Sequence, residues 1–162
     1  MPSASIQDGP AASLGTLVAS SATFQEWTGA TTVDAAREFI HYAVVEKLDQ
    51  DTPLERYARP FALVGFSSFT TAWATRGELF LLFEAEYANN DVYTVGDRYT
   101  TFARWVGTII DEIWQLGQDP GYLVIPREAG IEAIRPPTGA GRQDPELVFS
   151  QWFRVQYGLR AG

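Results

Sequence analysis

The chain has 162 residues, of which 12 are basic and 20 acidic, so its formal net charge is −8. Its length and its hydrophobic content of 46% suit one globular domain with a substantial core, whereas the acidic balance argues against gripping nucleic acid through its phosphates. Because cysteine is absent, disulfides, thiolate catalysis and sulfur-based zinc sites are all excluded.

The N-terminus predicts an arm rather than a targeting signal. Residues 1–11 are small and polar and contain proline and glycine, which favours a flexible arm, so we expect a single domain over residues 12–162. No basic region is followed by an apolar stretch, and no apolar run approaches the roughly 18 residues of a membrane span. The sequence therefore predicts neither a signal peptide nor a membrane span.

Four segments have apolar residues at helical spacing. Residues 13–21 and 22–29 predict two short helices, and residues 31–43 predict a longer one that Thr32 can cap. The strongest pattern lies in residues 97–117, where apolar side chains recur every three or four positions: Tyr99, Phe102, Val106, Ile109, Ile113 and Leu116. We expect this segment to be the main helix of the fold.

Four other segments predict β-strands, and they are the extended runs 59–74, 77–88, 121–136 and 146–159. The first two are joined by a stretch with the composition of a hairpin turn, and a polar loop rich in glycine and proline separates the last two. The economical architecture is an α+β fold. In it, two hairpins form a four-stranded, mainly antiparallel sheet, one long helix packs on that sheet, and short helices precede it.

Alternation within two of the runs assigns the faces of the strands. In the run 77–88 one face is apolar, and the other mixes apolar side chains with Glu84 and Glu86. In the last run Trp152 and Arg154 point away from the side chains expected against the long helix, which are Phe149, Phe153, Val155 and Tyr157. Such strands suit a sheet that is covered by helices on one side and is partly covered on the other side as well.

Patterns typical of catalysis or metal binding are missing. His41 is the single histidine, and its place at a predicted helix end beside core residues favours a structural or surface role over a Ser–His–acid triad. Glu84 and Glu86 share a strand face and can in principle act as an acid–base pair, but solvated carboxylates are the simpler interpretation. Spacings typical of zinc sites and EF-hands are absent. We therefore expect no catalytic residue, no cofactor and no metal.

Aromatic residues exceed what one small core readily hides, since the chain has five Trp, seven Tyr and ten Phe. They form either a large aromatic core or, in part, the anchors of an interface. Our candidate interface residues are Trp27, Trp152 and Arg154. Arg135 and Arg142 bracket the polar loop between the last two runs, where they serve either interface salt bridges or solubility.

The order and the lengths of several passages carry a resemblance to a protein family. The passages, in chain order, are "LVASSATFQEWTGA", "TTVDAAREFI", "RPFALVGF", "GELFLLFEAEY", "FARWVGTIIDEIWQLG", "YLVIPREAGIEAIRP" and "FSQWFRVQYGL". Together they cover nearly the whole chain after the arm, and none is a diagnostic motif. In this order they resemble the small tail-completion proteins of long-tailed bacteriophages, particularly the tail terminators.

The resemblance implies a structural virion protein rather than an enzyme. It implies a ring, commonly a hexamer, at the head-proximal end of the tail tube, which ends tube polymerisation and joins the tail to the head. The partners would be other copies of the chain, the tail tube protein and neck or connector proteins, assembled in the host cytoplasm into the virion. DNA would pass through the ring without specific binding, and an acidic lumen formed by Glu84 and Glu86 would repel it.

Three other functions stay open at this point. A neck or head–tail adaptor bound near the portal shares the resemblance. A small α+β enzyme or ligand-binding domain would use Glu84, Glu86 or His41, and a deep pocket that collects these groups would favour it. The third is a cellular interaction module without a role in a phage.

Overall fold

The computed structural model describes residues 8–47, 57–67, 76–87, 95–122, 124–134 and 147–159. The helical elements are α1 (Asp8–Ser20), α2 (Ala22–Thr28), α3 (Val33–Arg37), the short 3-10 helix η1 (Val45–Lys47) and α5 (Val95–Leu116). The strands are β1 (Ile40–Val44), β2 (Phe61–Phe66), β3 (Arg76–Tyr87), β4 (Val124–Ala133) and β5 (Leu147–Leu159). The fold is α+β, as the sequence predicts.

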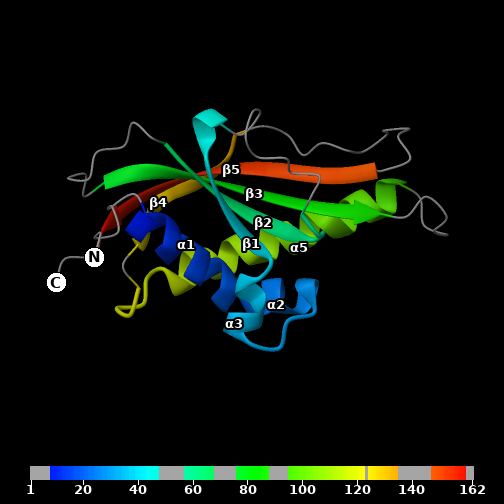
Figure 1. Cartoon of the computed structure of the whole chain (residues 1–162), viewed down its shortest axis with the longest axis horizontal. Helices are drawn as coiled ribbons and strands as arrows, with labels where there is room; N and C mark the ends of the chain where they lie inside the picture. The colour runs from blue at the N-terminus through cyan, green and yellow to red at the C-terminus, as the bar shows by residue number, and fades with distance from the viewer. Residues whose placement is uncertain are drawn as a thin grey trace.

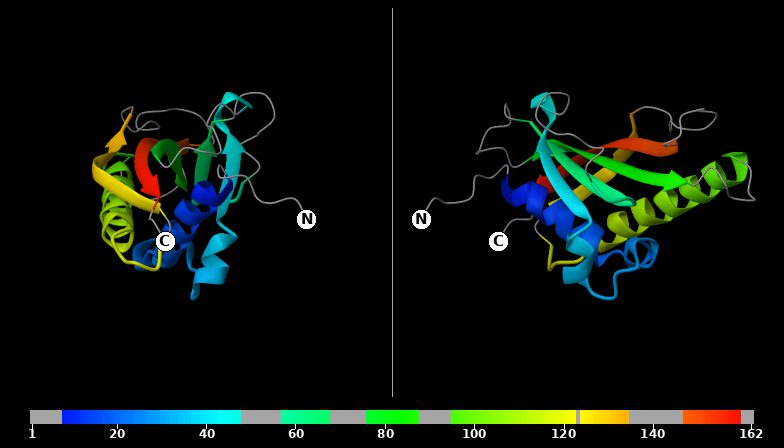
Figure 2. Two further views of the ribbon diagram at one scale, coloured as in Figure 1. Left: turned by 90° about the vertical axis from the view of Figure 1, so that its left-hand side faces the viewer. Right: turned by 45° about the vertical axis from the view of Figure 1, so that its right-hand side comes forward.

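The strands form one sheet in the order β1-β2-β3-β5-β4. Strand β1 runs parallel to β2, whereas β2–β3, β3–β5 and β5–β4 are antiparallel pairs. Helices α1, α2 and α5 lie on one side of this sheet, with α5 running along its length (Figure 1). Figure 2, in the end-on view at its left, shows β1 and β4 at the two opposite edges. We call the side toward these helices the helix face and the other side the open face.

The main core lies between the helix face and the three helices. Long helix α5 carries the predicted apolar stripe, and its Phe102 ring stacks on Phe149 of β5 with 5.4 Å between centroids. The other buried side chains of this core come from α1, α2 and alternate positions of the strands: Leu14, Leu17, Val18, Phe24, Val64, Leu79, Leu81, Phe83, Val106, Ile109, Ile113, Val155 and Tyr157. Burial of this apolar surface is the main force that holds the helices on the sheet.

Capping residues explain where the short helices begin and end. The Ser21 hydroxyl accepts a hydrogen bond from the Phe24 N–H, and the Thr32 hydroxyl accepts one from the Ala35 N–H, so both residues are N-caps. Gly29 ends α2 with φ of 77°, a left-handed conformation that glycine adopts without steric cost.

The prediction of a helix over residues 31–43 is wrong in its second half. Helix α3 stops at Arg37, and Ile40–Val44 form β1, which makes the sheet five-stranded and mixed rather than four-stranded and mainly antiparallel. The sequence from Ile40 to Val44 also fits a strand, because β-branched and aromatic residues pack well against a neighbouring strand. Pairing with β2 decides between the two structures, and that pairing is a tertiary contact.

Other predicted elements match the structure more closely. Strands β2, β4 and β5 lie within three of the four extended runs, and β3 begins one residue before its run. Residues 68–74 of the first run lie outside the described part of the chain. The strands form the two expected antiparallel pairs, and the two faces of β3 and β5 are as predicted. Helix α1 begins at Asp8 and includes the last four residues of the predicted arm, so these four residues are helical. Residues 1–7 lie outside the described part of the chain.

Gly77 allows a close approach between β3 and β5, although its sequence context suggested a turn. It is the cross-strand partner of Tyr157, whose ring passes over the glycine Cα. A Cβ atom at residue 77 would lie 2.6 Å from the Tyr157 hydroxyl oxygen. The missing side chain therefore lets a buried tyrosine lie flat against the sheet.

Replacing Gly77 by alanine should destabilise the protein by about 1–3 kcal/mol, because the new methyl group must displace Tyr157. The control is Gly107→Ala on the exposed side of α5, where a Cβ meets nothing within 4 Å. Since alanine is the better helix former, that change should stabilise the fold by about 0.5–1 kcal/mol. Urea unfolding measures both, and equal effects of the two substitutions would contradict the close approach at Gly77.

Candidate interaction surface

The open face of the sheet has a small hydrophobic cluster of its own. Four buried side chains from three adjacent strands form it, and they are Ala43, Phe61, Leu63 and Leu82. Tyr57 and Trp152 pack against this cluster and are partly buried. Leu82 and Trp152 are direct cross-strand partners, so the tryptophan stands at the boundary between the cluster and the remaining open face.

An aromatic stack fixes Tyr57 to the edge strand. Its ring lies parallel to the His41 ring with 3.7 Å between centroids, and Phe61 meets both rings edge-on. Burial lowers the pKa of His41 from its ordinary value of 6.5, because the neutral imidazole is easier to desolvate than the cation. His41 lies in strand β1 rather than at the end of a helix, and its ring packs against the rings of Tyr57 and Phe61.

Glu84 takes part in a buried polar cluster beneath this stack. Its carboxylate accepts a hydrogen bond of 2.7 Å from the Ser150 hydroxyl and forms an ion pair with Arg59, whose Nη2 lies 3.6 Å from Oε2. The two charged side chains are only 12% and 10% exposed, and the guanidinium also lies 6.0 Å from the Phe61 ring centroid. The cluster joins the chain segment before β2 to the middle of β3 and β5.

This cluster corrects the interpretation of Glu84 as a solvated carboxylate. Glu84 as a whole residue is 7% exposed, and its charge is balanced by Arg59, so within the folded chain it does not present a free charge to a channel. For Glu86 the structure describes the backbone in β3 and not the side chain. A lumen-facing role of Glu86 stays a prediction.

The exposed part of the open face lies at the other end of β3 and β5. Arg154 and Glu78 are 38% and 43% exposed there, and the Arg154 Nε lies 3.1 Å from the Glu78 carboxylate. Phe80 lies opposite Arg154 in the register and is half-buried. Trp152, Arg154 and Phe80 therefore share one surface, which we call the open patch. An aromatic and arginine surface of this kind has the composition of protein–protein hot spots.

Of the remaining predicted interface residues, the structure describes only Trp27, which does not join the open patch. Trp27 lies on the helix face, where its ring is 6.2 Å from each of the rings of Phe24, Phe83 and Phe102. Its partly buried side chain packs against the main core, on the opposite side of the sheet from the open patch. Arg135 and Arg142 lie outside the described residues.

A second surface is found at the edge strand β1. Tyr42 is 45% exposed, and with Ala11, Ala12 and Phe66 it lines an apolar hollow beside the start of α1. At the opposite edge, β4 contains Pro126 and a register shift between Pro126 and Ile131, two features that discourage further strand pairing. Strand β1 has neither feature, and no described strand pairs with its outer side.

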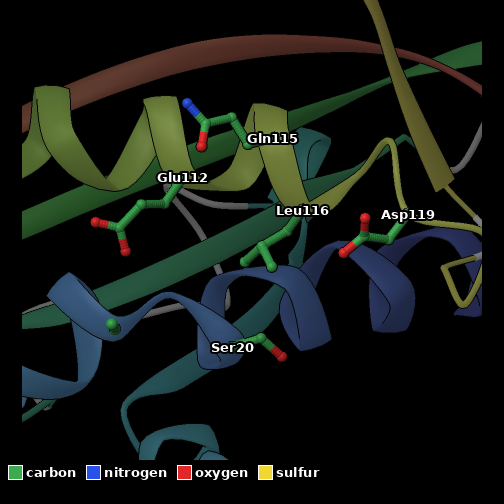
Figure 3. A pocket seen from close by; sticks show the side chains of 6 residues that line it. Ser20, Glu112, Gln115, Leu116 and Asp119 are labelled. Atoms are coloured by element: carbon green, nitrogen blue, oxygen red, sulfur yellow. The ribbon is translucent and has the colours of Figure 1, made fainter.

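Sequence analysis missed the role of Glu112, which connects α5 to the start of α2 (Figure 3). Its carboxylate accepts hydrogen bonds from the Ser21 hydroxyl at 2.9 Å, from the Thr23 N–H at 3.0 Å and from the Thr23 hydroxyl. Glu112 thereby accepts a hydrogen bond from an N–H group in the first turn of α2 that has no partner within the helix. Its negative charge also interacts favourably with the positive end of the helix dipole. A shallow pocket beside it is lined by Ser20, Ala22, Gln115, Leu116 and Asp119.

These contacts alter the acidity of Glu112. Burial alone would raise its pKa, but the hydrogen bonds from Thr23 and Ser21, with one from the Ala22 backbone, outweigh burial and lower the pKa below 4.5. A carboxyl group with a lowered pKa contributes stability above its ordinary pKa, and this contribution is lost as the pH falls through the lowered folded value.

Three features are absent from the described residues: a metal-ligating cluster, a pairing of His41 with a catalytic partner, and a membrane-spanning helix. They contain no cluster of three or more potential metal-ligating His, Asp or Glu side chains. Among them no hydrogen bond joins His41 to a serine or a carboxylate, and Glu84 lies in the ion pair with Arg59. Within the same residues no helix is long and apolar enough to cross a membrane.

Comparison with known proteins gives no relative. The chain matches no protein-family model, and neither a curated protein nor a solved structure is significantly similar to it.

The two ion pairs of β3 allow a matched test. Glu84→Gln removes the carboxylate from its ion pair with the largely buried Arg59 guanidinium and should cost about 3 kcal/mol of unfolding free energy. Glu78→Gln breaks the exposed pair with Arg154 on the same strand and should cost less than about 1 kcal/mol. Urea unfolding at neutral pH distinguishes the two, and a small cost for Glu84→Gln would contradict the buried cluster.

Glu112→Gln should destabilise the protein at pH 7 and flatten the acid side of its stability curve. Wild-type stability should fall as the pH drops below 4.5, where the free carboxyl begins to bind a proton, and the variant should lack that part of the decline. The control is Asp111→Asn, at the adjacent exposed position. Urea titrations between pH 7 and pH 3 measure the effect, and parallel curves for Glu112→Gln and wild type would rule it out.

Proposed function

We propose that this chain is a structural virion protein, the tail terminator of a long-tailed bacteriophage. In this role copies of the chain form a ring, commonly of six, at the head-proximal end of the tail tube. The ring ends tube polymerisation and offers the surface to which neck proteins attach. The proposal starts from the order of sequence passages that resembles this family, and the two-sided sheet supports it.

The observation that carries the proposal is the open patch. All of its residues come from the two longest strands, so the surface is rigid, and it combines half-buried rings with a charged pair. Contact with a neighbouring copy would bury Trp152. Arg154 would then pair with an acidic side chain of the neighbour, either in place of Glu78 or together with it. Rigid aromatic and arginine side chains suit such a contact, because little conformational entropy is lost when they are buried.

A closed ring also needs a second, different surface on each copy, because head-to-tail contacts are heterologous. The apolar hollow with Tyr42 at the unprotected edge of β1 is the best described candidate for that surface. The open patch lies toward the β5 side of the sheet, so the two surfaces are spatially separate, as successive contacts around a ring require.

The acidic charge of the chain fits the passage of DNA. A net charge of −8 per copy gives a ring a strongly negative field, which lets DNA slide through without sticking.

Because the charge of Glu84 is balanced by Arg59, Glu86 remains as the candidate residue that lines the lumen of the ring. Glu86→Lys in every copy should slow DNA ejection, and unchanged ejection would remove Glu86 from the lumen.

Electron microscopy of particles that lack the gene tests the function itself. Loss of a tail terminator should give overlong tails that are not joined to heads. Loss of a neck adaptor, the alternative with the same resemblance, should instead give normal tails and heads that leak DNA. Normal, infectious particles would contradict both roles.

Changes in the open patch should impair assembly more than folding. Trp152→Ala should weaken self-association roughly 30-fold, the effect of losing a hot-spot contact of about 2 kcal/mol. Arg154→Glu should weaken self-association as well, and because its side chain is partly exposed it should cost less than about 1 kcal/mol of folding stability. Sedimentation velocity measures the assembly, and circular dichroism during heating measures the fold.

The matched control for this test is Trp27→Ala. Its partly buried ring packs against the main core beside three other aromatic rings, so this substitution should cost about 3 kcal/mol of folding stability and lower the melting temperature. If Trp152→Ala and Arg154→Glu assemble as wild type does, the open patch is not a subunit interface.

A further inference from the structure

We draw no further inference here: the strongest candidate, the shallow acidic pocket between α2 and the end of α5, carries nothing because its Glu112 belongs to the helix cap already described and nothing else among the described residues points to a ligand.

Discussion

The middle part of strand β3, from Leu81 to Glu84, is buried on both of its faces and lies between β2 and β5 in the sheet. On the helix face its Leu81 and Phe83 contact the core formed with α1, α2 and α5. On the open face its Leu82 takes part in a second cluster, and Glu84 requires a cation and a hydroxyl as partners. Helices α1, α2 and α5 pack on the first of these two surfaces, and the open patch begins where the second cluster ends.

Two carboxylates link segments that are distant in sequence, one through an ion pair and one through hydrogen bonds. Glu84 holds the segment before β2 through Arg59, and Glu112 holds the start of α2 through Ser21 and Thr23. Both are therefore structural residues. Their positions limit the surface available for partners, and what remains on the sheet is the aromatic and charged end of β3 and β5.

The spacing of apolar residues predicts the helices and strands in which that spacing is regular. It fails where contacts with residues distant in the sequence decide whether a segment becomes a helix or a strand. Helix α5 and the two faces of β5 follow directly from apolar spacing. Strand β1 could not be predicted in this way, because its parallel partner β2 is reached only through a long connection. The burial of Glu84 depends on Arg59, and the role of Glu112 depends on residues about 90 positions away. Neither contact leaves a signal in the local sequence.

We propose that another copy of the chain covers the open face in the assembled protein. Native mass spectrometry of the purified wild-type protein over a range of concentrations tests it most directly. We expect a closed species whose mass is a fixed multiple of the 17.9 kDa chain, about six copies. A mass of 17.9 kDa at every concentration, with no larger closed species, would contradict it.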